Sequence, residues 1–130
     1  MKLLMFHAEE FWYRAHLPDE PEGEKTILPA GQVVFIHVEQ EDKDRPEVVD
    51  KAVGNIKWLS NKNNVGCVVL HSFAHLSSSK SDPDTADEIT QKIAEKLKKK
   101  MDVHIVPSGQ FYEFSIHVLG PSLAKVFKEI

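Results

Sequence analysis

The sequence predicts a single α/β domain in which helices pack on one mixed β-sheet. A length of 130 residues suits one domain with one hydrophobic core. Residues 65–71 are a nearly continuous apolar run, which is typical of a strand covered on both faces. Residues 46–59 and 83–97 instead space their apolar side chains as amphipathic helices do. The predicted order of elements is β-β-β-α-β-α-β-β-α.

The amino-terminal third predicts three strands. Residues 2–7 are largely apolar and lack the h-region and cleavage site of a signal peptide. Residues 11–16 are rich in aromatics, and the connection between these two strands is short enough for a hairpin. Prolines and glycines make residues 17–31 an exposed loop. Residues 32–39 form the third strand, in which His37 interrupts the apolar run.

Two predicted helices flank the central strand. The first begins near Pro46, which suits the first turn of a helix, and ends at the polar stretch 61–64. The second begins at Pro83, with acidic residues in its first turns and lysines in its last, as the helix macrodipole favours. These lysines form a solvated helix end or contact the phosphates of a nucleic-acid backbone. They are Lys96, Lys98, Lys99 and Lys100.

The carboxyl-terminal third predicts two strands and a helix. Residues 103–106 and 111–118 are the strands, and the second alternates its side chains between two faces. Pro121 begins a short terminal helix, whose apolar side chains are available for docking on the sheet. No internal repeat or low-complexity segment divides the chain, so the whole of residues 1–130 is expected to be one module.

Composition narrows the class of protein. Hydrophobic residues make up 42% and charged residues 28% of the chain, and the net charge is −4, so no overall electrostatic affinity for nucleic acid is expected. Cys67 lies in the apolar run and predicts a small buried hydrophobe, with no disulfide framework and no cysteine zinc site. No stretch approaches the roughly 20 apolar residues that cross a bilayer. We therefore expect a cytoplasmic protein with no membrane partner.

Several segments of the chain form a set of motifs. The most specific is the hexad Phe73-Ala74-His75-Leu76-Ser77-Ser78. The others are the strand ending in His7, the pairs Phe35-Ile36 and Val38-Glu39 with Pro46-Glu47 after them, and Pro107 with Gly109 before an aromatic strand. Together, in order and along nearly the whole chain, they resemble the amino-terminal editing domain of archaeal-type threonyl-tRNA synthetases.

The resemblance implies a fold, an activity and partners. The fold would be that of D-aminoacyl-tRNA deacylases, in a homodimer. The activity would be hydrolysis of serine mischarged onto threonine tRNA, in a pocket for the terminal aminoacyl-adenosine, by a positioned water and the substrate's own ribose hydroxyl. The chain ends where the synthetase's other domains would begin, so a free-standing, divergent member with a synthetase partner in trans is expected.

The chain departs from the family pattern on one side of this pocket. Tyr112 stands where the family carries a lysine, and Lys125 where its terminal helix carries a glutamate. His37 replaces a small residue, His71-Ser72 replaces a Tyr-Pro pair, and residues 119–122 replace a Lys-Gly-His-Pro segment. Two functions therefore stay open: a trans-editing hydrolase, and a non-catalytic relative that binds a nucleotide, an aminoacyl-tRNA end or a partner protein.

The residue chemistry and the resemblance select a small set of candidate site residues. His75 and Lys125 are the catalytic candidates, because an imidazole with a pKa of about 6.5 can activate water near neutral pH and a lysine could restore the missing positive charge. The candidates for substrate binding are His7, His37, Glu39, Ala74, Ser77 and Tyr112.

Each candidate also has a structural alternative. The ring of His75 could cap loop backbone, and Ser77 and Ser78 could cap the loop, since a serine nucleophile needs an adjacent base. Tyr112 could pack as an aromatic side chain with a pKa near 10, and Lys125 could be a solvated helix lysine.

A metal site is the remaining alternative for the chemistry. His7, His37, His71 and His75 all lie at or near predicted strand ends, and three converging imidazoles with an open position would suit a hydrolytic zinc ion. The histidines are scattered along the chain, so the expectation is no cofactor, with zinc as the alternative. The expected partners are the tRNA 3′ aminoacyl-adenosine end and a second copy, paired through an exposed edge strand.

Overall fold

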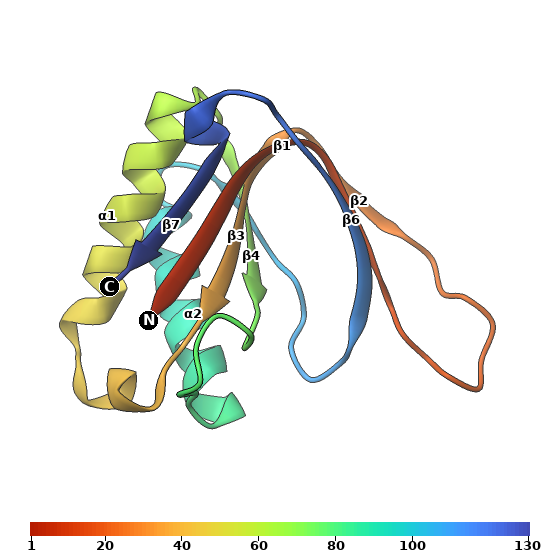
Figure 1. The fold of residues 1–130 in the computed structure, drawn as a ribbon, viewed down its shortest axis with the longest axis horizontal. Helices are drawn as coiled ribbons and strands as arrows, with labels where there is room; N and C mark the ends of the chain where they lie inside the picture. The colour runs from red at the N-terminus through yellow and green to blue at the C-terminus, as the bar shows by residue number, and fades with distance from the viewer.

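The fold is described by a computed structural model that covers all 130 residues (Figure 1). Its elements are β1 (Lys2–Ala15), β2 (Thr26–Leu28), β3 (Gly31–His37), η1 (Gln40–Asp44), α1 (Glu47–Lys62), β4 (Cys67–Ser72), α2 (Pro83–Leu97), β5 (Asp102–Ile105), β6 (Tyr112–Val118), η2 (Ser122–Ala124) and β7 (Lys125–Glu129). The prediction of one α/β domain with helices on a mixed sheet is therefore confirmed, although the elements at both ends of the chain differ from the predicted ones.

The long strand β1 holds the sheet together. It pairs antiparallel with β3 and β7 along its first half and with β2 and β6 along its second half. β3, β4 and β5 run parallel to one another, so their carboxyl ends lie at the same edge of the seven-stranded sheet. In Figure 1 both helices lie on one side of the sheet, and the second half of β1 curls away from them together with β2 and β6.

The two faces of the sheet carry separate cores, because side chains alternate along each strand. On the helix side, eighteen buried residues form one cluster, in which Leu3 and Leu70 pack under Ile56 of α1 and Ile93 of α2. The apolar spacing of both helices is therefore used as the sequence predicts. The opposite face holds a smaller aromatic cluster around Phe35. No helix covers this second face, which stays partly exposed.

The amino-terminal hairpin prediction is wrong. Residues 2–15 are one strand, and Glu9 lies in a bulge where the register with β6 shifts between Ala8 and Glu10. Two successive glutamates suggested a turn, but a bulge at the point where β1 changes partners exposes both side chains equally well. The short strand β2 also forms inside the predicted loop 17–31.

The terminal helix prediction is wrong as well. After the single turn η2, β7 pairs with the first half of β1. Val126 and Ile130 pack on the helix-side core, while Phe127 points away and is 48% exposed. A short apolar segment fits a helical or an alternating period, and here the open edge of β1 favours the strand.

The remaining predictions concern the cysteine and the membrane. Cys67 is free and only partly buried at the start of β4, and its thiol donates to the Ala30 carbonyl oxygen at 2.9 Å. Neither α1 nor α2 has the length and the apolar character that crossing a membrane requires.

Candidate functional site

The polar segments that follow β3 and β4 meet at the carboxyl edge of the sheet. In open α/β sheets this edge is where ligands bind. Here it brings together His37 at the end of β3 and Glu39 just beyond it with His71 near the end of β4 and the loop 73–80 that follows.

His37 holds this loop from the inside. The loop follows β4 and begins after the Phe73 amide, which donates to the Ile36 carbonyl of β3 at 2.8 Å. It ends at the Ser81 amide, which donates to the Val38 carbonyl at 3.0 Å. Between these points the fully buried ring of His37 accepts the Leu76 amide on Nδ1 at 2.8 Å and contacts the Ser79 carbonyl with Nε2 at 2.7 Å. A carbonyl only accepts, so Nε2 carries the proton. Both ring nitrogens are therefore occupied by the loop backbone.

Glu39 binds the same loop through charge. Its carboxylate accepts hydrogen bonds from the Met1 ammonium group at 2.9 Å, from Lys2 Nζ at 3.0 Å and from the Ser77 hydroxyl at 2.9 Å. Burial alone would raise the pKa of Glu39, but these donors outweigh it and hold the pKa at about 2. The group is ionised at neutral pH and cannot donate a proton, and Ser77 is engaged as its donor.

A cavity of about 180 Å³ opens between the end of β4, the start of α2 and the 106–112 segment. His71, Ala74 and Tyr112 line it. Burial lowers the pKa of His71, opposed by a hydrogen bond to the Ser72 backbone. The ring lies against Phe35 at 5.5 Å and Tyr112 at 5.9 Å between centroids. His71 is thus a neutral imidazole at pH 7 facing a cavity, which is the state a general base requires.

The far wall of the cavity carries a phenol and a carboxylate. The Tyr112 hydroxyl donates to the Pro107 carbonyl oxygen at 2.6 Å, and burial followed by the nearby Tyr13 raises the pKa of Tyr112. Tyr112 therefore stays protonated and fastens the 107–112 turn. Asp87 on α2 accepts the Ser108 hydroxyl at 3.2 Å and lines the same cavity. It is the one carboxylate among the lining residues.

His75 lies outside this lining. Its side chain is exposed, and its ring packs edge-on against Phe73 at 4.9 Å between centroids. The structural alternative that the sequence offered for His75, capping of loop backbone, is carried by His37 instead. His75 presents an aromatic surface beside the cavity that Ala74 lines.

His7 and Lys125 are not brought to this edge. His7 pairs with Gln32, five residues before His37 on β3 and hence about 16 Å away along the strand. Lys125 lies on β7, where it pairs with Phe6 of β1, and the strands β1 and β3 lie between β7 and β4. Its Nζ donates to the carbonyl oxygens of Leu119 at 2.8 Å and Gly120 at 3.1 Å.

The histidines are not gathered into one cluster in this arrangement. His7 is remote, His37 has both ring nitrogens occupied, and no group of three or more His, Cys, Asp or Glu side chains is placed to share an ion. The geometry gives the zinc alternative no set of ligands.

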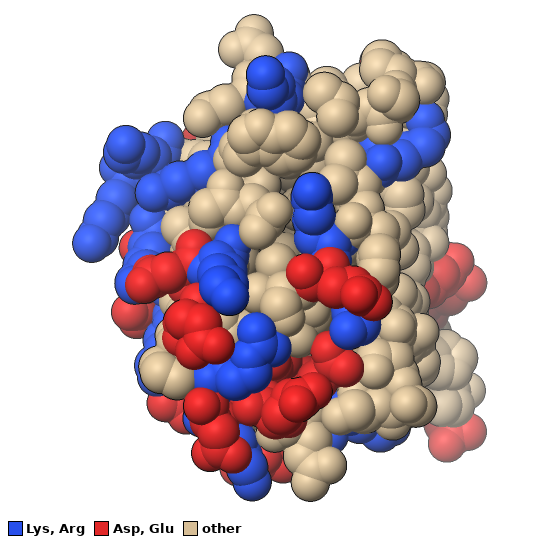
Figure 2. All heavy atoms as spheres, turned by 60° about the vertical axis from the view of Figure 1, so that its left-hand side comes forward, with Lys and Arg blue, Asp and Glu red and all other residues tan.

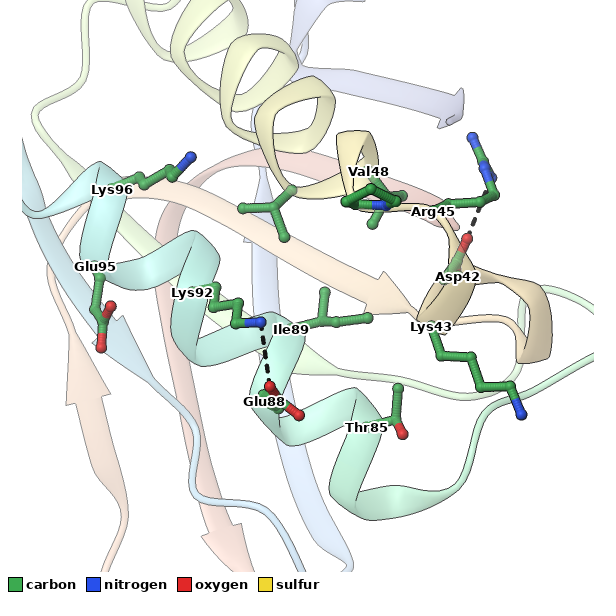
Figure 3. A pocket seen from close by; sticks show the side chains of 12 residues that line it. Asp42, Lys43, Arg45, Val48, Thr85, Glu88, Ile89, Lys92, Glu95 and Lys96 are labelled. Atoms are coloured by element: carbon green, nitrogen blue, oxygen red, sulfur yellow. Dashed lines mark hydrogen bonds and ion pairs between the residues drawn. The ribbon is translucent and has the colours of Figure 1, made fainter.

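A second cavity, of about 370 Å³, lies on the helix side between the start of α1 and α2 (Figure 3). Four of its charges form two pairs: Lys92 lies 3.1 Å from Glu88 and Arg45 lies 3.2 Å from Asp42. Figure 2 shows Lys and Arg interspersed with Asp and Glu over this side, with the acidic side chains in its lower half. This groove holds no histidine and no unpaired cation cluster, so the carboxyl-edge cavity is the better candidate.

Sequence reasoning missed two residues of that cavity. The sequence places His71 in the central strand, in the zinc alternative and in the pair that replaces Tyr-Pro beside the pocket, and Asp87 among the acidic residues at the start of the second helix, so neither is a candidate site residue. Strand alternation could have placed His71 on the face opposite Leu70, and helical spacing could have placed Asp87 beside Pro83 and Ala86. Neither pattern says which face opens into a cavity.

Comparisons with known proteins agree with this architecture. A family model described as the archaea-specific editing domain of threonyl-tRNA synthetase matches residues 1–130. The threonine–tRNA ligase of Methanosphaera stadtmanae is 34% identical over 138 residues and covers 100% of the chain, which spans 22% of that protein. The threonine–tRNA ligase editing subunit of Saccharolobus solfataricus is 31% identical, and the chain spans 34% of it. The chain thus spans a fifth to a third of these relatives.

A solved structure shares the fold. The c-Myc DNA unwinding element binding protein superposes with a TM-score of 0.76 over 100% of this chain and 99% of that one, at 12% sequence identity. This likeness supports the D-aminoacyl-tRNA deacylase-like fold and, at that identity, nothing beyond the fold.

Proposed function

Because the chain belongs to the family of archaea-specific editing domains of threonyl-tRNA synthetase, we propose that it hydrolyses the ester of a mischarged aminoacyl-tRNA, with seryl-tRNA(Thr) as the leading substrate. In this reaction a water oxygen adds to the ester carbonyl carbon. The bond from that carbon to the ribose oxygen then breaks, and the ribose oxygen leaves as a hydroxyl after taking a proton. The single observation that carries the proposal is a neutral imidazole, His71, facing the carboxyl-edge cavity.

In this proposal His71 takes the proton from the attacking water. Burial lowers its pKa, so the ring is unprotonated at pH 7 and can accept. No carboxylate accepts a hydrogen bond from its ring, in contrast to catalytic triads, so its basicity is modest. A positioned water and an activated ester suit such a base, because an aminoacyl ester is already a reactive acyl donor.

Asp87 supplies the charge that an aminoacyl group calls for. The α-amino group of an aminoacyl ester is cationic, and Asp87 is the one carboxylate lining the cavity. The cavity, at about 180 Å³, suits the aminoacyl group and the adjoining ribose better than a whole adenosine. The adenine would stack outside, on the aromatic surface that Phe73 and His75 present.

We further propose that the protein works as a homodimer and acts with a synthetase. The sheet face without helices exposes apolar side chains from two strands, Phe114 at 36% and Phe127 at 48%. Leu4 and Phe6 lie half-buried on that face. A second copy would cover this surface, and light scattering with Phe127→Glu tests it: the variant should be monomeric.

A deacylation assay tests the activity. The chain is incubated with seryl-, threonyl- and D-aminoacyl-tRNAs, and with N-acetylseryl-tRNA, which lacks the cationic amino group. Seryl-tRNA(Thr) should be cleaved, and Asp87→Asn should raise KM for it by about tenfold while leaving any cleavage of the acetylated ester unchanged. Binding of these tRNAs with no turnover of any would instead support the non-catalytic relative, which the tyrosine at position 112 favours.

A further inference from the structure

We propose that His37 is a positioning residue, whose neutral ring sets the shape of the 73–80 loop and hence the place of Ala74 and His75 beside the cavity. This inference rests on the proposed function for its consequence on activity, but its structural part does not. His37 is fully buried, and the two backbone atoms that it bonds belong to Leu76 and Ser79, three residues apart in the loop.

The path of the backbone shows why the loop needs a side chain such as His37 to support it from the inside. Phe73 bonds Ile36 in β3, and Ser81 bonds Val38, which lies directly after the end of that strand. Residues 74–80 therefore bulge out from β3 over a single residue, His37. Without a side chain inside this bulge, the Leu76 amide and the Ser79 carbonyl would lose their partners, and unpaired buried backbone groups are costly.

A second anchor fastens the outer part of the loop and limits what His37 must do. The Ser77 hydroxyl donates to Glu39 at 2.9 Å, and the Gln40 amide donates to Ser79 Oγ at 3.2 Å. The loop would therefore stay attached in a His37 variant while its inner part, near Leu76 and Ala74, loses its fixed path. The expected defect is in substrate positioning and not in folding.

Two substitutions separate the two bonds of the ring. In His37→Asn the amide oxygen can replace Nδ1 as the acceptor for the Leu76 amide, and in His37→Gln the amide nitrogen can replace Nε2 as the donor to the Ser79 carbonyl. Hydrogen exchange should show the Leu76 amide protected in the wild type and in His37→Asn, and exchanging at least about tenfold faster in His37→Gln. The exposed His16→Asn serves as the matched control and should not change it.

Spectroscopy and kinetics complete the test. A two-bond ¹H–¹⁵N spectrum at pH 7.5 should show the proton of His37 on Nε2 alone. On seryl-tRNA, His37→Gln should raise KM by about tenfold or more with a smaller change in kcat, and His37→Asn should recover part of the loss. A proton on Nδ1, or Leu76 exchange equally slow in His37→Gln, overturns the proposal. A wild type without deacylase activity would end the proposed function, while exchange and the spectrum still decide the role of His37.

Discussion

His37 and His71 occupy equivalent places, at the ends of neighbouring parallel strands and on the same face of the sheet, yet their surroundings differ. Both are buried, at 0% and 8% exposure. Both nitrogens of His37 are used by the 73–80 loop, whereas the ring of His71 packs against aromatic rings and faces a cavity. The difference teaches that burial does not by itself mark a reactive histidine. An imidazole is available for chemistry only where the protein leaves a nitrogen unbonded and gives it space.

The largest effect is expected at Glu39, which binds the same 73–80 loop as His37. Glu39→Gln removes a nearly buried negative charge that faces the Met1 ammonium group and Lys2. The free energy of unfolding from urea titration should fall by about 3 kcal/mol, because the cations keep their desolvation cost without their partner. Glu113→Gln is the matched control: it breaks the pair of the 52% exposed Glu113 with Arg14 and should cost clearly less than Glu39→Gln, because solvent screens the exposed pair. Equal losses in both variants would contradict this view of the loop anchor.

The next effect tests which histidine acts as the base, His71 or His75. His71→Asn should lower kcat for seryl-tRNA(Thr) by about 100-fold, the scale of a lost general base, while the protein still folds. His75→Ala should act mainly on KM, because the exposed ring offers stacking surface and not a base. A His71 variant with full kcat would show that His71 is not the base, and His75 would then be the candidate.

The sequence predicts the local elements of this site, but not the contacts between residues that are far apart in the chain. The central strand, the helices and the loop after β4 were predictable, because apolar periodicity is local and strong in those segments. The partners of His37 lie 39 and 42 residues away in the chain, and no local pattern links them. His75 carries the most specific motif, but whether a side chain points into a cavity depends on packing between β4, α2 and the 107–112 turn.

The two wrong predictions, the amino-terminal hairpin and the terminal helix, have a physical reason as well. The bulge at Glu9 and the strand β7 both depend on β1, whose free edges only exist once the sheet has formed. Lys125 was placed on a helix near the pocket for this reason. As the first residue of β7 it lies across the sheet from His71, which the local sequence could not reveal.

A smaller effect is expected from pH, and it concerns His71. Its folded pKa lies below the unfolded value of about 6.5, so its contribution to stability is fully present above that value and is lost as pH falls through it. The free energy of unfolding should decrease between pH 7.5 and 5.5, by at most about 1.4 kcal/mol for each unit of lowered pKa. His71→Asn should flatten the slope, leaving the part that the half-buried His104, whose pKa burial also lowers, contributes. An unchanged slope in the variant would show that His71 is solvated in the folded protein.

The smallest effect is expected at Lys125, the catalytic candidate that the fold moved away from the cavity. Its Nζ is exposed and bonds the carbonyl oxygens of Leu119 and Gly120, so Lys125→Ala should cost about 0.5 kcal/mol of stability through a looser 119–121 turn. Deacylation of seryl-tRNA(Thr) should change by less than about twofold, since two strands, β1 and β3, lie between β7 and β4. Lys125→Arg, which keeps the charge, should behave the same. A tenfold loss in Lys125→Ala that Lys125→Arg restores would mean that the charge reaches a reacting ester after all, and the two histidines would then share the site with a group from the other end of the sheet.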